Sequence, residues 1–213
     1  MCGLLIQLCC RIVARALTLS DMAFVFVCLS PTALVAPTKL VVLSHGLYGA
    51  AINMAVLKEE LQRLGGADVR VHCAAANEGR TRDGVAAGGR RLAAEVECIA
   101  RSTPSMETIS LVGNSLGGLY TRYAAGELLD TASGRLAGLE PDVFVTIGCP
   151  HLGVRQFTYL PLPPPLRRLG PLVAGRTATD LLLGDAGCGE GGASTPLLVE
   201  MAREGGRYLE SPN

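Results

Sequence analysis

The 213-residue sequence contains no tryptophan, few other aromatic residues and no excess of either charge. Aromatic side chains make up 4% of the chain, and 19 basic residues balance 19 acidic ones. Proteins that bind nucleic acids usually present clusters of Lys and Arg, often with aromatic residues that stack on bases. Neither such clusters nor an acidic tail is present, so we expect no nucleic-acid partner.

The cysteines form no pattern typical of a metal site or a redox centre. There are eight of them, with no C-x-x-C pair and no His at ligand spacing, which argues against a zinc site and a thioredoxin-like motif. We therefore expect neither a metal nor a cofactor. Cys73, Cys98 and Cys149 lie within apolar runs, where a free Cys commonly packs as a small buried hydrophobe.

No clean apolar run is long enough to cross a membrane. Residues 22–36 fall short of the roughly 20 residues needed, and Pro31 interrupts them. The run ends in small residues, as a targeting segment does before its cleavage site, but Asp21 breaks the region that should be basic. Residues 1–36 are therefore a targeting segment or an extension of the gene model, and residues 37–213 are assigned to one domain. A cytoplasmic or membrane-associated location is favoured, with targeting as the alternative.

The sequence after Pro37 alternates between strands and helices. Short β-branched, apolar runs, typical of strands buried on both faces, occur at residues 39–44, 69–73, 108–112 and 143–147. Helices are expected at 51–64, at 90–101, from about 118 to 129 and from about 195. Residues 77–89 are expected to form a glycine-rich loop, 160–171 a proline-rich surface excursion, 181–183 a short apolar stretch and 184–192 a glycine-rich turn. This order predicts an α/β fold, a parallel sheet with helices on both faces.

Residues 113–117 read G-N-S-L-G, a match to G-x-S-x-G between a predicted strand and a predicted helix. Such a turn holds its serine on a sharp bend, and the residues two positions away are glycines because side chains there would clash. The next backbone N–H then lies at a helix N-terminus, where it stabilises an oxyanion. Ser115 is the predicted nucleophile and Leu116 an oxyanion-hole donor. The alternative is a structural glycine turn with an incidental serine.

The first predicted strand ends in H-G-x-x-G at residues 45–49. A strand followed by this pattern resembles the oxyanion loop of lipases, in which the residue after His-Gly supplies the second N–H. Leu47 is therefore the second predicted donor. His45 and Gly46 are predicted to support the loop, with the His45 ring bracing it and taking no part in catalysis. A loop histidine with no role is the alternative.

Four blocks in the same order resemble the DUF676 serine-esterase family, a group of lipase-like α/β-hydrolases. They read L-V-V-L-S-H-G-L-Y-G, N-E-G-R-T-R-D-G-V-A-A-G-G-R-R-L-A-A-E-V, L-V-G-N-S-L-G-G-L-Y-T-R-Y-A and F-V-T-I-G-C-P-H-L-G-V-R. The resemblance covers residues 39–202 and implies an α/β-hydrolase fold that hydrolyses carboxylic esters of acyl lipids. The family nucleophile maps onto Ser115 and its oxyanion loop onto residues 45–48. Members typically continue beyond the point matching Asn213, where they carry the triad Asp and His, so we expect a domain truncated at its C-terminus.

A complete catalytic triad cannot be assembled in the order Ser, acid, His. His151 is the only His after Ser115, and the family pattern places it in a P-H-L-G turn, so it is at most a substitute base. His72 lies within a predicted strand, and Asp185 has no His after it. The acids between Ser115 and His151 are expected to lie away from the catalytic edge: Glu127, Asp130, Glu140 and Asp142.

Two functions follow from this pattern. The first is a serine hydrolase acting on acyl-lipid esters, which we expect to be poor or inactive as this chain stands because its nucleophile lacks a base. The second is a non-catalytic hydrolase-like module that binds a ligand or a partner. The expected substrate is a small-molecule acyl ester or lipid, compatible with peripheral contact with a membrane, and the oligomeric state is undefined. The expected walls of an apolar cleft are Tyr48, Leu116, Leu119, Phe157 and Leu160.

Overall fold

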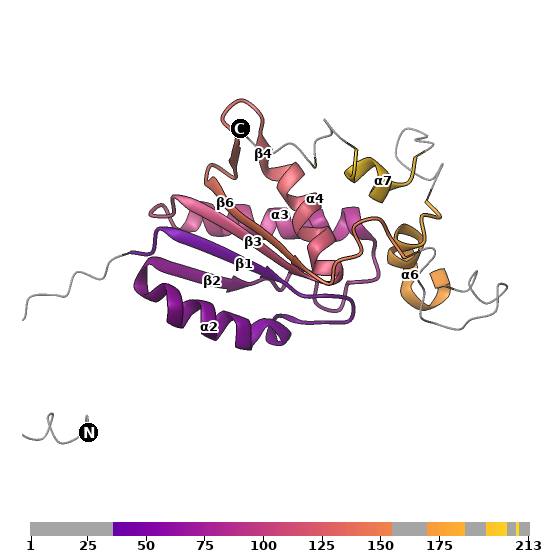
Figure 1. Ribbon diagram of the computed structural model, residues 1–213, viewed down its shortest axis with the longest axis horizontal. Coiled ribbons are helices and arrows are strands. Elements are labelled where there is room, and N and C mark those ends of the chain that lie inside the picture. The colour runs from indigo at the N-terminus through magenta and orange to yellow at the C-terminus, as the bar shows by residue number, and fades with distance from the viewer. Residues whose placement is uncertain (1–35, 155–169, 186–194, 204–207, 209–213) are drawn as a thin grey trace, which may run out of the picture. The chain divides into compact units, whose positions relative to one another are not determined.

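The computed structural model describes residues 36–154, 170–185, 195–203 and 208, which belong to one compact unit of the chain, residues 35–213 (Figure 1). The segment predicted at residues 1–36 lies outside these residues except for Ala36, and so do the predicted proline-rich excursion up to residue 169 and most of the glycine-rich turn at 184–192.

Four parallel strands form the main sheet in the order β2-β1-β3-β6. They are β1 (Lys39–Ser44), β2 (Val69–Cys73), β3 (Thr108–Asn114) and β6 (Glu140–Ile147). A short antiparallel hairpin of β4 (Leu129–Asp130) and β5 (Arg135–Leu136) precedes β6 in the chain. The register pairs Ser44, the last residue of β1, with Gly113 of β3. The segments that follow β1 and β3 therefore start from the same edge of the sheet.

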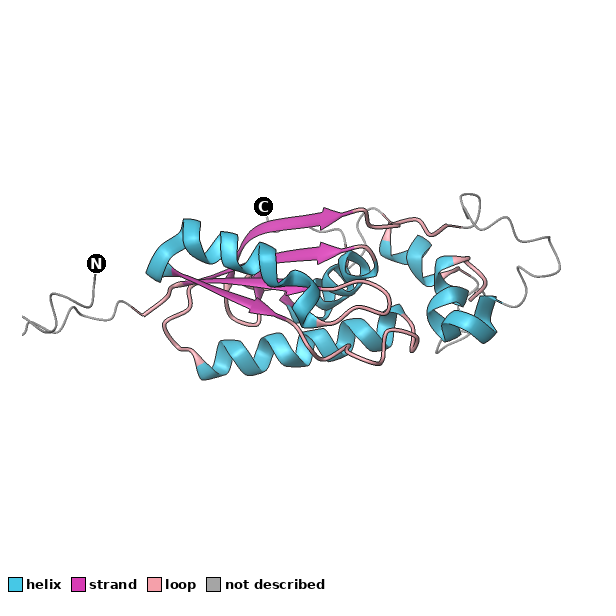
Figure 2. Ribbon diagram, turned by 90° about the horizontal axis from the view of Figure 1, so that it is seen from below, coloured by secondary structure: helices cyan, strands magenta, loops and turns pink. Residues whose placement is uncertain are grey.

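Helices cover both faces of this sheet, as Figure 2 shows. The described helices are η1 (Ala51–Met54), α2 (Ala55–Gly65), η2 (Gly66–Asp68), α3 (Val85–Ser102), α4 (Leu116–Leu128), α6 (Gly170–Leu181) and α7 (Leu197–Met201). The parallel sheet and its two helical layers confirm the α/β-hydrolase class predicted from the sequence.

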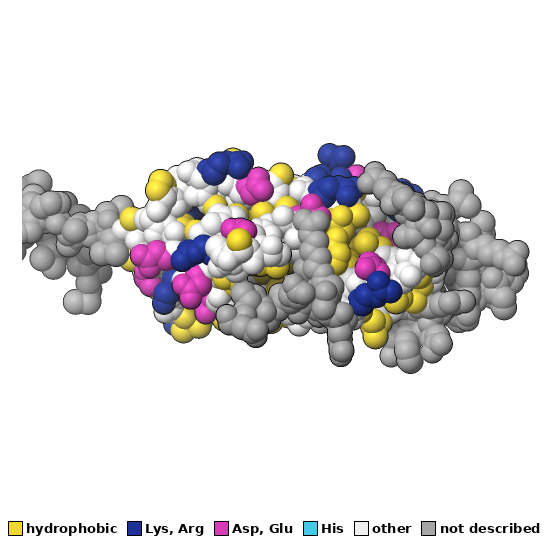
Figure 3. Space-filling view, turned by 90° about the horizontal axis from the view of Figure 1, so that it is seen from above, with side chains coloured by type: hydrophobic (Ala, Val, Ile, Leu, Met, Phe, Trp, Pro, Cys, Tyr) yellow, Lys and Arg dark blue, Asp and Glu magenta, His cyan; other side chains and the backbone are white. Residues whose placement is uncertain are grey.

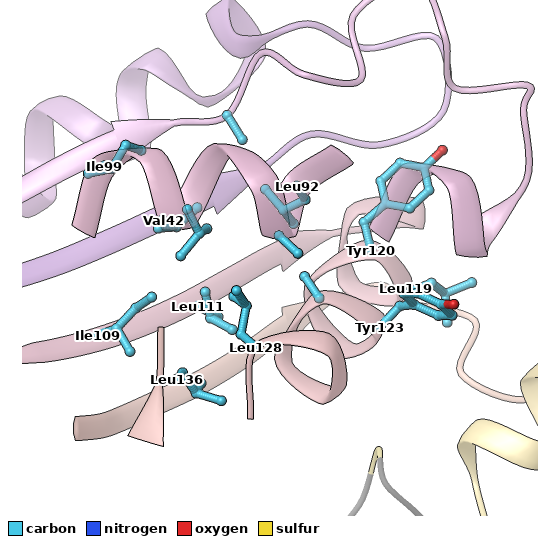
Figure 4. Close-up of a cluster of buried hydrophobic side chains, with 14 of the residues drawn as sticks. Val42, Leu92, Ile99, Ile109, Leu111, Leu119, Tyr120, Tyr123, Leu128 and Leu136 are labelled. Carbon is cyan, nitrogen blue, oxygen red and sulfur yellow. The ribbon is translucent and has the colours of Figure 1, made fainter. Parts of the chain in front are cut away.

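Two hydrophobic clusters fill the space between sheet and helices. Val42 of β1 packs with Leu92 of α3 and Leu119 of α4 in the larger cluster (Figure 4). Leu43, the next residue along β1, packs with Met54 of η1 in the smaller cluster. Neighbouring side chains of a strand point to opposite faces, so β1 contributes to both clusters. Burying each such side chain stabilises the fold by roughly 1.5–3 kcal/mol.

The strand order places a topological switch point between β1 and β3. The chain runs from β1 outward to β2, returns to β3 beside β1, and then continues to β6 on the other side. In open α/β sheets, ligands bind outside the carboxyl ends of the strands at the point where the strand order reverses. The segments that follow β1 and β3, starting at His45 and Ser115, lie at this point.

The structure corrects the predicted start of the second helix. We expected a glycine-rich loop at 77–89 and a helix from residue 90, but α3 begins at Val85. The reason is close packing of α3 on α4: a Cβ on Gly88 would lie 2.1 Å from Tyr120 Cε1, and one on Gly89 would lie 2.4 Å from Tyr123 Cδ1. These glycines make room for two aromatic rings inside a helix.

Three further expectations differ from the structure. The last strand of the sheet begins at Glu140, where we expected residue 143, because the Glu140 N–H already bonds to Glu107 O at 2.8 Å beside β3. Leu181, expected in a short apolar stretch, instead ends α6, a helix interrupted at Gly175. Cys98 is an exposed free thiol and not a buried one, because it lies on a solvent-facing position of α3.

Candidate active site

Ser115 occupies the turn between β3 and α4, the strand-to-helix bend predicted from G-x-S-x-G. It directly precedes α4, with φ 53 and ψ −123, a left-handed conformation that non-glycine residues seldom adopt. Its N–H donates to Ile147 O at 2.7 Å, which ties the bend to the end of β6. The side chain is partly exposed. Within the described residues, no hydrogen bond is formed by the Ser115 hydroxyl.

The two glycines of the motif are required by backbone contacts around Ser115. A Cβ on Gly113 would lie 2.3 Å from Gly118 Cα, and one on Gly117 would lie 2.2 Å from Ser44 O. Backbone atoms, unlike the ends of side chains, cannot turn away from such contacts. Strand, bend and helix therefore pack too closely for any larger residue at these two positions.

The turn after β1 lies directly beside this bend. A Cβ on Gly46 would lie 3.0 Å from Ser115 Cβ and 3.5 Å from its hydroxyl oxygen. The Gly49 N–H donates to Gly46 O at 3.0 Å, which closes a tight turn over residues 46–49. His45 Nδ1 lies 3.0 Å from the same oxygen. A carbonyl oxygen can only accept, so this nitrogen carries the ring proton.

These contacts orient the peptide group that carries the Leu47 N–H. The Gly46 carbonyl and the Leu47 N–H share one planar peptide group and point in opposite directions. In the described part of the chain, the Leu47 N–H has no hydrogen-bond partner. The Leu116 N–H lies in the first turn of α4, where backbone N–H groups have no acceptor within the helix. The turn after β1 and the start of α4 thus each carry a backbone N–H without an acceptor among the described residues, and Gly46 of that turn lies beside Ser115.

A buried polar residue that we did not predict, Thr81, bonds to the Gly46–Gly49 turn. Thr81 is 3% exposed, and its Oγ1 accepts the Tyr48 N–H at 3.0 Å. Its carbonyl oxygen accepts the Tyr120 hydroxyl at 3.2 Å and the Thr177 hydroxyl at 2.7 Å. Thr81 lies in the N-E-G-R-T-R-D-G block that carries part of the family resemblance. Its place in this block was the only feature of the sequence that could have pointed to Thr81.

His151 follows β6 at the correct edge of the sheet, but both its ring nitrogens have partners. Nε2 lies 3.0 Å from Thr146 Oγ1, and Nδ1 lies 3.4 Å from Arg122 Nη1. Because a guanidinium only donates, Nδ1 must accept and Nε2 carries the proton. Burial lowers the pKa of His151, and the positive charge of Arg122 lowers it further. No hydrogen bond joins this ring to Ser115 in the described residues, so His151 as a substitute base stays a prediction.

The other candidate residues of the sequence lie in structural contacts. His72 Nε2 pairs with Glu95 at 2.7 Å, partly exposed on β2. Asp130 accepts the Ser133 hydroxyl at 2.6 Å in the β4–β5 hairpin. Glu140 and Asp142, expected before the last strand, lie within β6. Asp185 Oδ2 accepts the Leu197 N–H at 2.8 Å, at the start of α7.

Cys149 lies next to the bend but is no alternative nucleophile. A Cβ on Gly118 would lie 2.6 Å from its sulfur. Burial raises the pKa of the Cys149 thiol to about 11, although the charge of Arg122 opposes the rise. The reactive form of cysteine is the thiolate, so this raised pKa disfavours Cys149 as a nucleophile at neutral pH.

The expected cleft walls are only partly supported by the structure. Leu116 and Leu119 are buried in the core, at 1% and 0% exposure, because the first turn of α4 packs against the sheet; they therefore offer no open wall. Tyr48 is 64% exposed beside the bend, and Phe157 and Leu160 lie outside the described residues. On the face seen in Figure 3, charges of both signs are mixed and hydrophobic side chains are exposed between them.

The described residues contain neither a membrane-spanning helix nor a cluster of metal ligands. None of the described helices is both long and apolar enough to span a bilayer. Nor does the described part of the chain bring three or more His, Cys, Asp or Glu side chains together as a metal site would require.

Comparisons with known proteins identify the family. Among solved structures, the mature form of the lipase BlEst2 from Bacillus licheniformis is 20% identical, with a TM-score of 0.44 over 70% of this chain and 56% of that one. Its propeptide form is 19% identical, with a TM-score of 0.45 over 68% of this chain and 30% of that one. The chain thus spans about half the length of the mature lipase. No curated protein matches it. The model of the family described as "Putative serine esterase (DUF676)" matches residues 35–191, and the chain belongs to this family of esterase-like hydrolases.

Proposed function

We propose that the chain is a serine hydrolase that cleaves carboxylic esters of acyl lipids through Ser115. The observation that carries the proposal is the strained bend at the N-terminus of α4, which presents a hydroxyl that has no hydrogen-bond partner among the described residues. In this reaction the Ser115 oxygen bonds to the ester carbonyl carbon, the alcohol leaves, and water then releases the acid from the acyl-enzyme. The carbonyl oxygen, negatively charged in between, accepts the N–H groups of Leu47 and Leu116.

An uncharged acyl substrate fits the surface beside the bend. Tyr48 in the turn after β1, Ile52 in η1 and Val56 in α2 are 64%, 75% and 76% exposed. Exposed apolar side chains of this kind can contact acyl chains in a lipid aggregate or at a membrane surface. The esterase-like family membership supports the same substrate class.

A second candidate function rests on the histidines. The sequence contains three, all of which the structure describes, and none forms a hydrogen bond with Ser115. Without a base, a serine hydroxyl is a weak nucleophile at neutral pH. The chain would then bind an acyl ligand or a partner at the same edge of the sheet without turning it over.

An esterase assay with a Ser115→Ala variant separates the two functions. For the hydrolase, we expect slow cleavage of short and long acyl esters, limited to roughly 10³-fold over water by the missing base. Ser115→Ala should lower this rate, because it removes the nucleophile and leaves only the backbone donors and binding, whereas Ser133→Ala, in the β4–β5 hairpin, should not change it. Equal rates for the chain and its Ser115→Ala variant would leave only the binding module, and cleavage of p-nitrophenyl phosphate in place of acyl esters would refute the substrate class.

A further inference from the structure

The turn after β1 contains a residue whose backbone is held against its preference. Tyr48 has φ 55, a left-handed conformation disfavoured for every residue with a Cβ. A β-turn with a positive φ at its third residue can lose this strain if the peptide group before that residue rotates by about 180°. The Tyr48 N–H belongs to that peptide group, and it donates to Thr81 Oγ1 at 3.0 Å. Rotation would break this bond to the hydroxyl of the buried Thr81, so the Thr81 hydroxyl keeps the strained turn in place.

The same residue also contacts the helix that follows Ser115. Thr81 O accepts the hydroxyl of Tyr120, which is fully buried on α4. Tyr120 lies four residues after Leu116, one helical turn further along. Thr81 therefore bonds to both segments that carry the proposed oxyanion-hole donors, through its hydroxyl to the turn of Leu47 and through its carbonyl to the helix of Leu116.

We propose that Thr81 is a positioning residue that sets the separation of the Leu47 and Leu116 N–H groups. This inference rests on the proposed function, because it assigns a role to Thr81 only if the two N–H groups stabilise an oxyanion on Ser115. Donors in such a site must lie about 2.7–3.1 Å from the developing charge. A misplacement of about 1 Å, even one caused by a residue remote from the chemistry, lowers the rate by up to about 10²-fold.

The test compares two substitutions at Thr81. Thr81→Val keeps the shape of the side chain and removes the acceptor, and Thr81→Ser keeps the acceptor. We expect Thr81→Val to lower kcat for a short acyl ester by about 10- to 100-fold with little change in KM, and Thr81→Ser to retain kcat within about threefold. The matched control is Thr103→Val, which removes a hydroxyl that bonds to Arg70 at the opposite edge of the sheet. A Thr81→Val kcat equal to that of the control, or a Thr81→Ser kcat as low as that of Thr81→Val, would overturn the inference.

A second measurement does not depend on turnover. A phenylboronic acid adds to a serine hydroxyl and forms a tetrahedral anion, so we expect it to shift the amide NMR signals of Leu47 and Leu116 in the unsubstituted chain and not in Ser115→Ala. Thr81→Val should raise the dissociation constant about 10-fold or more, and Thr81→Ser should leave it nearly unchanged. Equal affinity in Thr81→Val would refute the positioning role alone. Failure of the proposed function would look different, because Ser115→Ala would then match the unsubstituted chain in both hydrolysis and binding.

Discussion

At the scale of single residues, the candidate site depends on glycine positions at which the surrounding atoms leave no room for a side chain. A Cβ added at any of three glycines would lie only 2.2 to 3.0 Å from a backbone or Cβ atom of a neighbouring residue: Gly113, Gly117 and Gly46. The sequence pattern alone predicts that a side chain would clash at the two glycines of the G-x-S-x-G motif. The role of Gly46 beside Ser115 becomes visible only when β1 and β3 are paired.

Gly117→Ala tests this close packing, because helix propensity predicts a gain in unfolding free energy and the packing predicts a loss. Alanine in place of glycine within a helix normally stabilises by about 1 kcal/mol. Here the new Cβ would lie 2.2 Å from Ser44 O and 2.6 Å from His45 O, so we expect the variant to lose about 1–3 kcal/mol of unfolding free energy. Urea denaturation measures the difference. Gly184→Ala, with no neighbour closer than 3.6 Å to its Cβ, should stay within about 0.5 kcal/mol of the unsubstituted chain. A stabilised Gly117→Ala would show that the bend is looser than described.

At the scale of elements, local pattern predicts the strands well and the ends of helices poorly. Strands at residues 39–44 and 69–73 are confirmed with their predicted bounds, because a buried parallel strand is a compact apolar run. The predicted start of α3 was wrong by five residues. Its two glycines indicated a loop, but they make room for aromatic rings of α4, which lie far away in the sequence. The hairpin of β4 and β5 was missed because two-residue strands carry no periodic signal.

The N-terminus of α3 is capped by residues more than 90 positions further along the chain. The Gly84 N–H donates to Thr177 Oγ1 at 3.0 Å, and the Val85 N–H donates to Asp180 Oδ2 at 2.7 Å. First-turn N–H groups have no partner within the helix, so α6 supplies the acceptors that α3 lacks. No capping signal could therefore be found near residue 85 in the sequence.

Substitution of Asp180 tests this long-range cap. Asp180→Ala leaves a buried N–H without a partner, so we expect a loss of about 1–3 kcal/mol in unfolding free energy, whereas Asp180→Asn keeps an acceptor. Burial raises the pKa of Asp180, and Asp185 adds to the rise, against the opposing effects of the Val85 N–H and Arg176.

The pH dependence of the same variants has a definite sign. With a folded-state pKa above the ordinary 3.8, the folded chain binds a proton at Asp180 more tightly than the unfolded chain. The stability of the unsubstituted chain relative to Asp180→Asn should therefore be greatest below pH 3.8 and should fall as the pH rises through the folded-state pKa. Denaturation at several pH values measures this difference, and the opposite slope would contradict the buried environment of the carboxylate.

At the scale of the whole molecule, the sequence predicted which residues meet at the sheet edge, but not which of them are free to react. The order of the strands brings the segments after β1, β3 and β6 to one edge, as the family resemblance implied. The His151 ring contacts Thr146 and Arg122, and no hydrogen bond in the described residues joins it to Ser115. Contacts of this kind join residues from different elements, so the sequence pattern does not contain them.

Addition of free imidazole tests whether the chain has a working nucleophile that lacks only its base. None of the three histidines of the chain forms a hydrogen bond with Ser115, and a positioned general base contributes about 10²- to 10⁴-fold in rate. We expect imidazole to accelerate hydrolysis of a short acyl ester about 10-fold or more, most strongly above its own pKa, where it is neutral. Imidazole cleaves activated esters by itself, so the same additions to Ser115→Ala provide the background, and only the excess over that variant counts. Equal acceleration of both proteins would exclude a reactive Ser115, and a fast reaction without imidazole that is lost in His151→Ala would make His151 the base after all.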